Sequence, residues 1–509
     1  MQGKPRQSAK KRAFTPVYVS PRQLTLEGFE TTFEQKLSQN NRWVKLAHAI
    51  PWDSIVGHYD KLFPSKEGRP PISGRVILGA IIIKHLGNLS DRETIAQIAE
   101  NPYMQYFLGY SSFIQQEPFS ATLFVEIRER LSVDLLARIN EVITVNHIQD
   151  GLSKESVQPS NDVEDNNRGQ QEGNEAKEDF VQETEREPGE EIQTNKGKLL
   201  VDATVAPQDI TFPTDLKLLD AARRKSEQLI DRLYDAERHG KVKPRTYRKI
   251  ARKNYLNTAK KKRKSIRELY KANGQQLRYL RRNLKTIDVL LESYLSFPLQ
   301  YKDLRYIMIL HSVYSQQHKM YRSRSHVVAD RIVSIHQPHV RPIVRGKEKA
   351  KTEFGSKIHV SMVSGFTFID HLSWDAFNEG SYLIHSVEAY KRRLGFYPSQ
   401  VHADQIYCTR ENRRWLKEKG IRLMAKPLGR PRAGAVKNHL SPGERNPIEG
   451  RFGQGKLRYG WDNIRAKLQT TSESRVASIA LVLNLIALAR QAPPSQFLAF
   501  IRPNRFPQF

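Results

Sequence analysis

Apolar positions at helical spacing mark the first third of the chain. Residues 73–86 form an apolar stretch, residues 87–89 a short turn, and a second amphipathic stretch begins at Ser90. Ser90 followed three places later by Glu93 is typical of a capping box, which starts a helix. A helix, a short turn with a glycine and another helix are also the outline of a helix-turn-helix, so the pair either reads DNA or is plain helical packing.

A second helical pattern lies between residue 216 and about residue 296. Two apolar seams advance in steps of three and four: Leu219, Ala222, Ser226, Leu229 and Leu233, then Leu277, Leu280, Leu284, Ile287, Leu291 and Tyr294. Such seams predict an antiparallel helical hairpin. The chain between them is dense in lysine and arginine with tyrosine interspersed, which suits contacts to backbone phosphates. The residues assigned to DNA binding are Lys260, Lys261, Lys262, Arg263, Lys264, Arg281 and Arg282; the alternative is a solvated helix face.

Short apolar runs separated by turn residues predict strands on both sides of these seams. The runs lie at residues 199–201, 331–346, 356–363, 365–374, 399–409 and 421–427. Helical patterns at residues 381–396, 410–420 and 476–489 alternate with the later runs. This order predicts an α/β core with one large helical insertion.

The charge of the chain points to its partner. The formal net charge is +29 over 509 residues. The segment 151–198 carries six Lys or Arg and thirteen Asp or Glu, a net charge of −7, so the remainder carries +36. A surplus of this size favours binding to a polyanion such as double-stranded DNA.

Cysteine usage and hydropathy predict a soluble intracellular protein. Cys408 is the only cysteine in the sequence, which excludes an internal disulfide and fits a reducing compartment. No Cys/His cluster suggests zinc, and the basic N-terminus has no apolar core of a secretory signal. The longest apolar runs, 76–83 and 476–489, are shorter than the ~20 residues that span a bilayer. We therefore expect no membrane partner.

Within the stretch 444–468, the predicted helix that starts at Asn446 combines one acid, several cations and three glycines. Asn446 is a good helix N-cap, Pro447 fits the first helical position and Glu449 falls three residues after the cap. This pattern is either an ordinary capping box or a site in which Arg445, Glu449 and Lys456 share one side of a helix. Gly450, Gly453 and Gly455 favour a site, because glycines weaken a helix by about 1 kcal/mol each and let a phosphate come close.

Two aspartates end buried strands. Asp202 follows the run 199–201, and Asp404 lies near the end of another predicted strand. A buried carboxylate is costly unless it is paired or binds a metal, although an Asp that only starts a turn is the simpler alternative for Asp202. Asp209, Asp215, Asp370 and Asp375 also follow predicted strands, with Asp370 as the main rival, so spacing alone does not choose the ligands.

Five segments together resemble the catalytic blocks of bacterial insertion-sequence transposases with an RNase H-like core and an Asp-Asp-Glu triad. They are residues 202–215, 354–380, 401–423, 426–432 and 444–460. By this resemblance, Asp202, Asp404 and Glu449 are the triad. The related signature around the third acid is Tyr-x2-Arg-x3-Glu-x6-Lys; Arg445, Glu449 and Lys456 match it, while Pro442 stands where Tyr is expected.

The sequence patterns and the resemblance together predict a domain plan and a chemistry. The plan is a basic flexible arm (1–40), a helical N-terminal DNA-binding domain (41–149), an acidic disordered linker (150–198), an RNase H-like catalytic core (199–215 and 327–492), a basic helical insertion (216–326) and a C-terminal tail (493–509). Three carboxylates can hold two Mg²⁺ or Mn²⁺ ions for phosphodiester chemistry. The expected protein is a cytoplasmic, nucleoid-associated transposase that acts as a homodimer on DNA.

Two other functions fit the same sequence. A domesticated or inactive relative would bind DNA through the same basic surfaces without cutting it, although the presence of all three acids argues against decay. A metal nuclease would cut without joining, and sequence does not separate cutting from joining.

Overall fold

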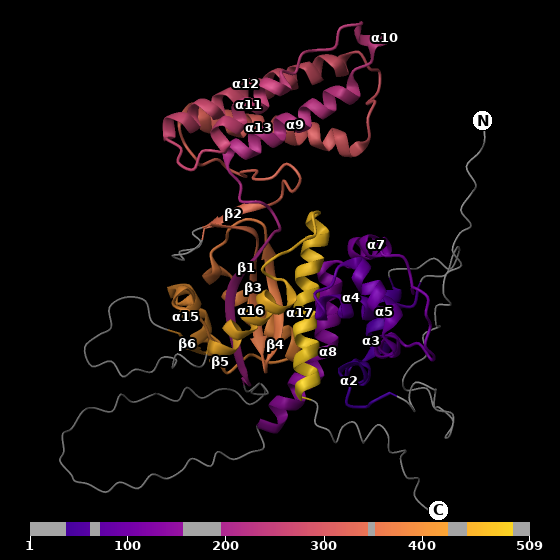
Figure 1. The fold of residues 1–509 in the computed structure, drawn as a ribbon. Helices are drawn as coiled ribbons and strands as arrows, with labels where there is room; N and C mark the ends of the chain where they lie inside the picture. Colours follow the sequence, from indigo (N-terminus) through magenta and orange to yellow (C-terminus); the bar gives the residue numbers. More distant parts are fainter. Residues whose placement is uncertain (1–36, 62–71, 156–194, 345–351, 426–444, 492–509) are drawn as a thin grey trace, which may run out of the picture.

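The computed structural model describes residues 37–61, 72–155, 195–344, 352–425 and 445–491. Figure 1 shows a sheet with flanking helices, a cluster of N-terminal helices beside it and a long helical unit beyond one end of the sheet. Most of the predicted arm, linker and C-terminal tail lies outside the described residues, as do Pro442 and residues 426–432.

All the regular elements of the N-terminal cluster in the described ranges are helices. Its helices are α2 (Arg42–Ala49), α3 (Trp52–Asp60), α4 (Gly74–Leu86), α5 (Asp91–Glu100), α6 (Pro102–Phe107), α7 (Leu123–Arg130) and α8 (Val133–Glu155). The capping box at α5 is confirmed, since Ser90 and Glu93 exchange hydrogen bonds of 3.2 and 2.8 Å. α8 continues through Glu155, past the predicted start of the linker at residue 150.

The pair α4 and α5 has the geometry of packed core helices. α4 is buried on nearly every side, which explains its uninterrupted apolar sequence. The exposed side of α5 carries Arg92, Glu93, Gln97 and Glu100, one cation against two anions. Because DNA backbones attract cations, this face favours plain helical packing over DNA reading.

The mixed sheet has six strands: β1 (Lys198–Pro207), β2 (Arg341–Val344), β3 (Thr352–Val363), β4 (Phe366–Ser373), β5 (Gln400–His402) and β6 (Arg422–Met424). The strand order is β2-β3-β1-β5-β6, and β4 also pairs with β3. β1 runs antiparallel to β3 and parallel to β5, and β6 is parallel to β5. The apolar run predicted as a strand at 331–346 forms only the short β2, because residues 331–340 are irregular.

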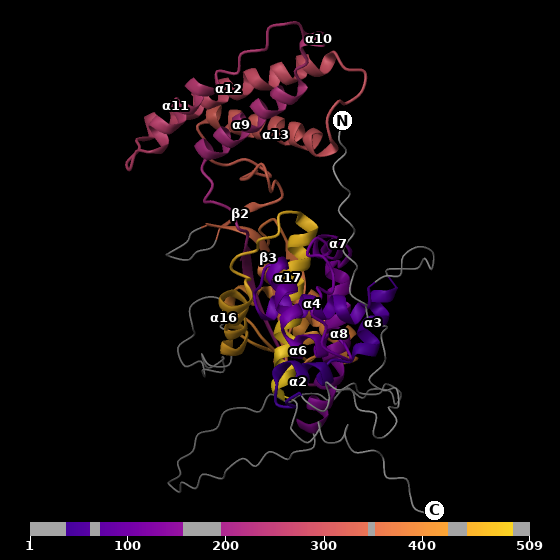
Figure 2. The same cartoon turned by 45° about the vertical axis from the view of Figure 1, so that its right-hand side comes forward.

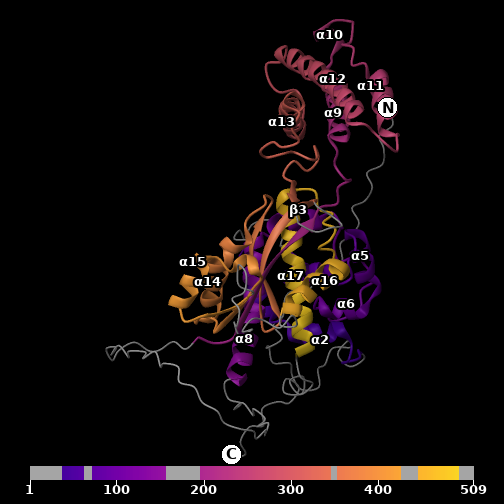
Figure 3. The ribbon, with the colours of Figure 1, turned by 90° about the vertical axis from the view of Figure 1, so that its left-hand side faces the viewer.

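The sheet separates two apolar cores because side chains alternate along β1. Leu199 and Val201 face α14 (Leu383–Leu394), whereas Leu200 and Ala206 face α16 (Asn446–Tyr459) and α17 (Gln469–Gln491). Figure 3 shows α14 and α15 (Arg410–Glu418) on one side of the strands and α17 on the other. α17 is long and apolar enough to span a membrane, but 78% of that stretch is buried inside the protein, as expected of a core helix.

The helical unit lies between β1 and β2 in the chain. It contains α9 (Asp215–Leu233), α10 (Ala236–His239), α11 (Arg248–Ala259), α12 (Ile266–Glu292) and α13 (Tyr301–Ser323). The two predicted seams meet in one core, and α13 adds Ile307, Leu310 and Val313 to it. Figure 2 shows the unit above the sheet, to which two connecting segments join it. At the base of the unit, Arg331 forms an ion pair with Asp215 at 2.7 Å. This contact holds the segment that enters the unit beside the segment that leaves it.

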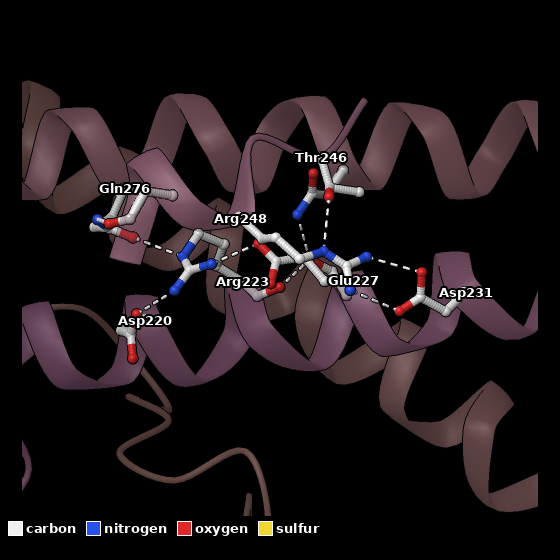
Figure 4. A network of polar contacts seen from close by, with 10 residues as sticks. Asp220, Arg223, Glu227, Asp231, Thr246, Arg248 and Gln276 are labelled. Atoms are coloured by element: carbon white, nitrogen blue, oxygen red, sulfur yellow. Dashed lines mark hydrogen bonds and ion pairs between the residues drawn. The ribbon is translucent and has the colours of Figure 1, made fainter. Parts of the chain in front are cut away.

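A buried ionic network stabilises this unit (Figure 4). Arg223, only 1% exposed, is ion-paired to Asp220 and Glu227 on its own helix and donates to Gln276 of α12 at 3.0 Å. Arg248 of α11 forms two bonds with Asp231 of α9, at 2.9 and 2.8 Å. The buried guanidinium therefore has carboxylate and amide partners, as a buried charge requires.

A buried amide pair joins the N-terminal helices to the sheet. Asn484 of α17 donates to Thr367 O at 2.7 Å and to Asn140 Oδ1 at 2.8 Å, and its oxygen accepts from Thr367 N. Asn140 of α8 also donates to Thr367 O at 3.0 Å. Three elements distant in sequence, α8, β4 and α17, thus share one polar contact in the core.

We predict that Asn484→Leu destabilises the protein by on the order of 3 kcal/mol, because it leaves the Thr367 amide and the Asn140 carbonyl buried without partners. Urea unfolding followed by circular dichroism measures the change. Asn257→Leu, the same substitution at an exposed position of α11, is the matched control and should cost less than about 1 kcal/mol. Equal effects of the two substitutions would contradict the structural role of the amide pair.

Candidate active site

The two candidate aspartates lie level with one another, Asp202 inside β1 and Asp404 two residues after β5, so the prediction that Asp202 ends a strand is wrong. The register of β1 with β5 aligns Leu200 with His402, so Asp202 and Asp404 follow at equivalent positions. Asp202 is on the side of β1 that faces α16, and its Oδ1 accepts from Ala203 N at 2.7 Å. Asp404 follows β5 and is the N-cap of the short helix η2 (Gln405–Tyr407). Its side chain accepts a hydrogen bond from Gln405 N at 2.8 Å.

Arg445 joins the two carboxylates. Its Nη2 lies 3.2 Å from Asp202 Oδ2, and its Nη1 lies 3.2 Å from Asp404 Oδ1. Its Nε is buried and has no hydrogen-bond partner among the described residues. One guanidinium therefore occupies the position between two acids, where it offsets their mutual repulsion.

Burial dominates the electrostatics of Asp202. Removal from water raises the pKa of this carboxyl to about 6, although the hydrogen bond from Ala203 and the charge of Arg445 act in the opposite direction. Glu379 and Asp404 raise the same pKa by repulsion. Asp202 is thus the buried member of the acid pair, while the side chain of Asp404 is 58% exposed.

Glu379 is a further acid near this site that the sequence analysis missed. It lies in the short helix η1 (Glu379–Tyr382), acts on Asp202 through its charge, and pairs with Lys357 of β3 at 2.9 Å. η1 packs against η2, with Ile406 O beside Gly380 at a distance that excludes a side chain. The sequence held only a weak signal for this, the Asn378-Glu379-Gly380 turn, because the contact depends on two short helices distant in the chain.

The N-terminus of α16 differs from the capping box predicted at Asn446. The capping residue is Arg445, which has helical backbone angles (φ −92°, ψ −14°) and makes no side-chain cap. The helix therefore begins one residue earlier than predicted, so Glu449 does not fall three residues after the N-cap and the predicted capping box is wrong. Pro447 lies in the first turn, as the sequence indicated.

Glu449 lies one turn after Arg445 on the exposed surface of α16. No group of three His, Cys, Asp or Glu residues in the described ranges is close enough to hold a metal ion. The structure therefore brings Asp202, Asp404 and Arg445 together and leaves Glu449 outside that cluster. Lys456 follows two turns further on the same helix, partly exposed.

The glycines of α16 have different environments. A Cβ on Gly450 or Gly453 would meet no described residue within 4 Å, so these two positions leave the surface of the helix open toward the described part of the chain. A Cβ on Gly455 would lie 2.3 Å from Trp461 Cε3. Gly455 is therefore required for packing against Trp461, and only Gly450 and Gly453 suit the close approach of a ligand.

The rival acids have other partners. Asp370 of β4, whose side chain is 0% exposed, pairs with Arg393 at 3.0 Å and accepts from Ser386 at 2.6 Å. Asp215 pairs with Arg331 in the helical unit, and Asp375 lies 3.8 Å from Arg341. None of these three approaches Arg445 in the described structure, so geometry favours Asp202 over them.

A chain of buried hydrogen bonds leads from Asp370 toward the site. Ser386 Oγ donates to Asp370 Oδ2, so it accepts from His359 Nδ1 at 3.2 Å; His359 Nε2 then accepts from Tyr407 Oη at 3.0 Å. Burial lowers the pKa of His359 to about 4, which keeps its ring neutral as this arrangement requires. These hydrogen bonds hold Tyr407, three residues after Asp404, and so help to position η2.

The seven basic residues assigned to DNA binding are exposed on the helical unit. Lys260 directly follows α11, the next four lie between α11 and α12, and Arg281 and Arg282 are on α12. Lys261 is ion-paired to Glu268, and Arg282 lies over the rings of Tyr247 at 4.5 Å and Tyr279 at 5.9 Å. The remaining cations face solvent as a dense positive surface.

Comparison with known proteins finds transposase domains in two parts of the chain. Residues 31–130 match a family described as a transposase domain (DUF772), and residues 401–486 match the transposase DDE domain. The second match includes Asp404 and Glu449. These matches support a transposase function, DNA cleavage and DNA binding.

One curated relative is similar to part of the chain. It is the uncharacterized protein ORF8 in the nfe locus of Rhizobium meliloti, 24% identical over 230 residues, which are 44% of this chain and 87% of that protein. No solved structure matches the chain.

We predict opposite effects of alanine at two glycines of α16. Gly455→Ala should destabilise the protein by about 1–3 kcal/mol, because the added methyl group overlaps Trp461. Gly453→Ala should stabilise it by up to about 1 kcal/mol, since the new side chain has open space and alanine favours helix. Chemical denaturation of both variants measures the difference, and a Gly455→Ala protein as stable as Gly453→Ala would contradict the packing described.

Proposed function

We propose that the chain is the DNA transposase of an insertion sequence, which binds the terminal inverted repeats of its element and catalyses strand cleavage and strand transfer. The observation that carries the proposal is the convergence of Asp202 and Asp404 on Arg445 at adjoining parallel strands, in a chain with two transposase-domain matches. The mixed sheet, with antiparallel β4, β3 and β1 followed by parallel β5 and β6, supports an RNase H-like core.

Asp202 and Asp404 are the proposed metal ligands, and Glu449, which lies outside their cluster in this structure, is proposed as the third acid. Two observations fit a cation at this place: the pair already holds a positive group between its oxygens, and burial makes an uncompensated charge on Asp202 costly. Carboxylate oxygens are hard donors that favour Mg²⁺ or Mn²⁺. When bound, two such ions supply activation of the attacking oxygen and stabilisation of the leaving oxygen.

The protein residues position the DNA around that chemistry. Arg445 and Lys456 are assigned to the phosphates beside the scissile bond, because both lie along α16 with Glu449 and Arg445 already contacts both aspartates. Gly450 and Gly453 leave room for the DNA backbone beside Glu449. Water is the first nucleophile, and the 3′-hydroxyl that it releases attacks target DNA in the second step.

The basic surface of the helical unit is proposed to hold the double-stranded DNA backbone. A homodimer on the paired ends and a cytoplasmic, nucleoid-associated location complete the proposal. The alternatives, a non-catalytic DNA-binding relative and a nuclease that cuts without joining, are separated from it by assays of cleavage and of strand transfer.

We predict that Asp202→Ala, Asp404→Ala and Glu449→Ala each reduce cleavage of the element's ends on the order of 10³-fold or more, since each removes part of the metal's contribution to the transition state. DNA binding and the circular dichroism spectrum should stay close to wild type. Asp375→Ala, an exposed acid just after β4, is the control and should cleave normally. Wild-type cleavage by any of the three variants would remove that residue from the site.

We predict that replacing Lys260, Lys261, Lys262, Arg263 and Lys264 with glutamine weakens binding to all DNA sequences alike. The slope of log affinity against log salt concentration should fall by about 0.9 for each phosphate that the variant no longer neutralises. The measurement is fluorescence anisotropy on cognate ends and on unrelated duplex at several salt concentrations. Weaker binding to the cognate ends alone would show that this segment reads bases.

A further inference from the structure

The two aspartates of the candidate site share one positively charged partner, Arg445. Its Nη2 lies 3.2 Å from Asp202 Oδ2, and its Nη1 lies 3.2 Å from Asp404 Oδ1. Each carboxylate also accepts one backbone hydrogen bond, from Ala203 N at 2.7 Å and from Gln405 N at 2.8 Å. Those amides are neutral, so the one guanidinium serves as the counter-ion of both acids.

The guanidinium is incompletely bonded at this position. The side chain of Arg445 is 19% exposed, and its Nε is buried with no hydrogen-bond partner among the described residues. A buried donor without a partner costs free energy, which weakens the hold of the acids on Arg445. A divalent cation carries twice the charge of a guanidinium and takes carboxylate oxygens as ligands. Arg445 therefore lies where it competes with a metal ion for the two aspartates.

The rest of α16 is fixed against the sheet, whereas Arg445 is at its very start. Ile448, only 1% exposed, belongs to the apolar core that α16 shares with β1 and α17. Further along, Gly455 packs on the ring of Trp461. Arg445 is the N-cap and makes no side-chain cap, so its side chain has no role in holding the helix. The guanidinium can therefore leave the two acids while α16 stays in place.

We propose that Arg445 is an exchangeable counter-ion, which holds Asp202 and Asp404 together, gives up its place to a metal ion and then turns to a phosphate of bound DNA. The exchange keeps the charge of the acids offset throughout, because the guanidinium leaves only as a stronger cation arrives. It also orders the assembly of the site, since Arg445 becomes available to DNA after the acids have bound metal. The inference rests on the proposed function for the metal ligands and for DNA as the partner.

The first test measures binding of Mn²⁺ to the full chain by titration calorimetry, without DNA. Arg445→Gln should bind Mn²⁺ more tightly than wild type, by on the order of tenfold or more, because no guanidinium has to be displaced. Arg445→Lys keeps the charge, but its single ammonium bridges two acids less well than a planar fork, so its affinity should lie between the other two. Arg458→Gln, an exposed arginine on the same helix, is the matched control and should bind as wild type does.

Two results would overturn the exchange. One is an Mn²⁺ affinity of Arg445→Gln that equals that of wild type or is weaker. The other is a wild-type affinity in Arg445→Lys, because Arg445 would then repel the metal without being displaced by it. If Arg445→Gln does not fold, Arg445→Lys alone decides between these outcomes.

Asp202→Asn separates the exchange from the proposed function. This variant should abolish Mn²⁺ binding in the same titration. Binding that survives in Asp202→Asn would reject the proposed metal ligands and, with them, the exchange. That result differs from the two above, in which the ligands stand and only the role of Arg445 fails.

The second test asks whether Arg445 turns to DNA. The affinity for a short duplex is measured by fluorescence anisotropy, with a chelator or with saturating Ca²⁺, another cation that binds carboxylate oxygens. The loss of affinity caused by Arg445→Gln should be larger with Ca²⁺ by on the order of fivefold, because only then is the guanidinium released. Arg458→Gln should show equal losses in both conditions. Equal losses in Arg445→Gln would overturn the turn to DNA, and neither test requires cleavage.

Discussion

The pairing of β1 on both of its sides is the constraint on which the other parts of the molecule depend. β1 pairs with β3 over nearly its whole length and with β5 only over its first residues. Where β5 ends, Asp202 has no strand neighbour on that side, and Asp404, η2 and the start of α16 occupy that place. The candidate site is thus built at the point where a short strand stops beside a long one.

Much of the fold could be predicted from local patterns. The capping box at Ser90, the start of β1, the seams of α9 and α12 and the buried C-terminal helix each depend on residues close in sequence. The length of β1 was not predicted, since the strand continues past Asp202 to Pro207. Periodicity did not predict α13 as a third long helix of the unit, because its apolar face is interrupted by polar residues.

Features that depend on contacts between distant residues were missed. Glu379 reaches the site only because η1 packs on η2, and His359 is fixed by residues of α14 and η2. The three glycines of α16 are equivalent in sequence, yet Trp461 contacts only one of them. The start of α16 was placed one residue late because Arg445, held by two carboxylates, already has helical angles.

The ion pair between Asp215 and Arg331 has a consequence for how the sheet assembles. Leu200 of β1 pairs with Met362 of β3, and the whole helical unit lies between them in the sequence. Closing a long flexible loop to form such a pair is entropically unfavourable. When the unit is folded, Asp215 and Arg331 are in contact at 2.7 Å, so the two chain segments that lead to β1 and β2 leave from neighbouring points. The effective loop is then short, and folding of the unit before the sheet shortens the search for the β1–β3 register.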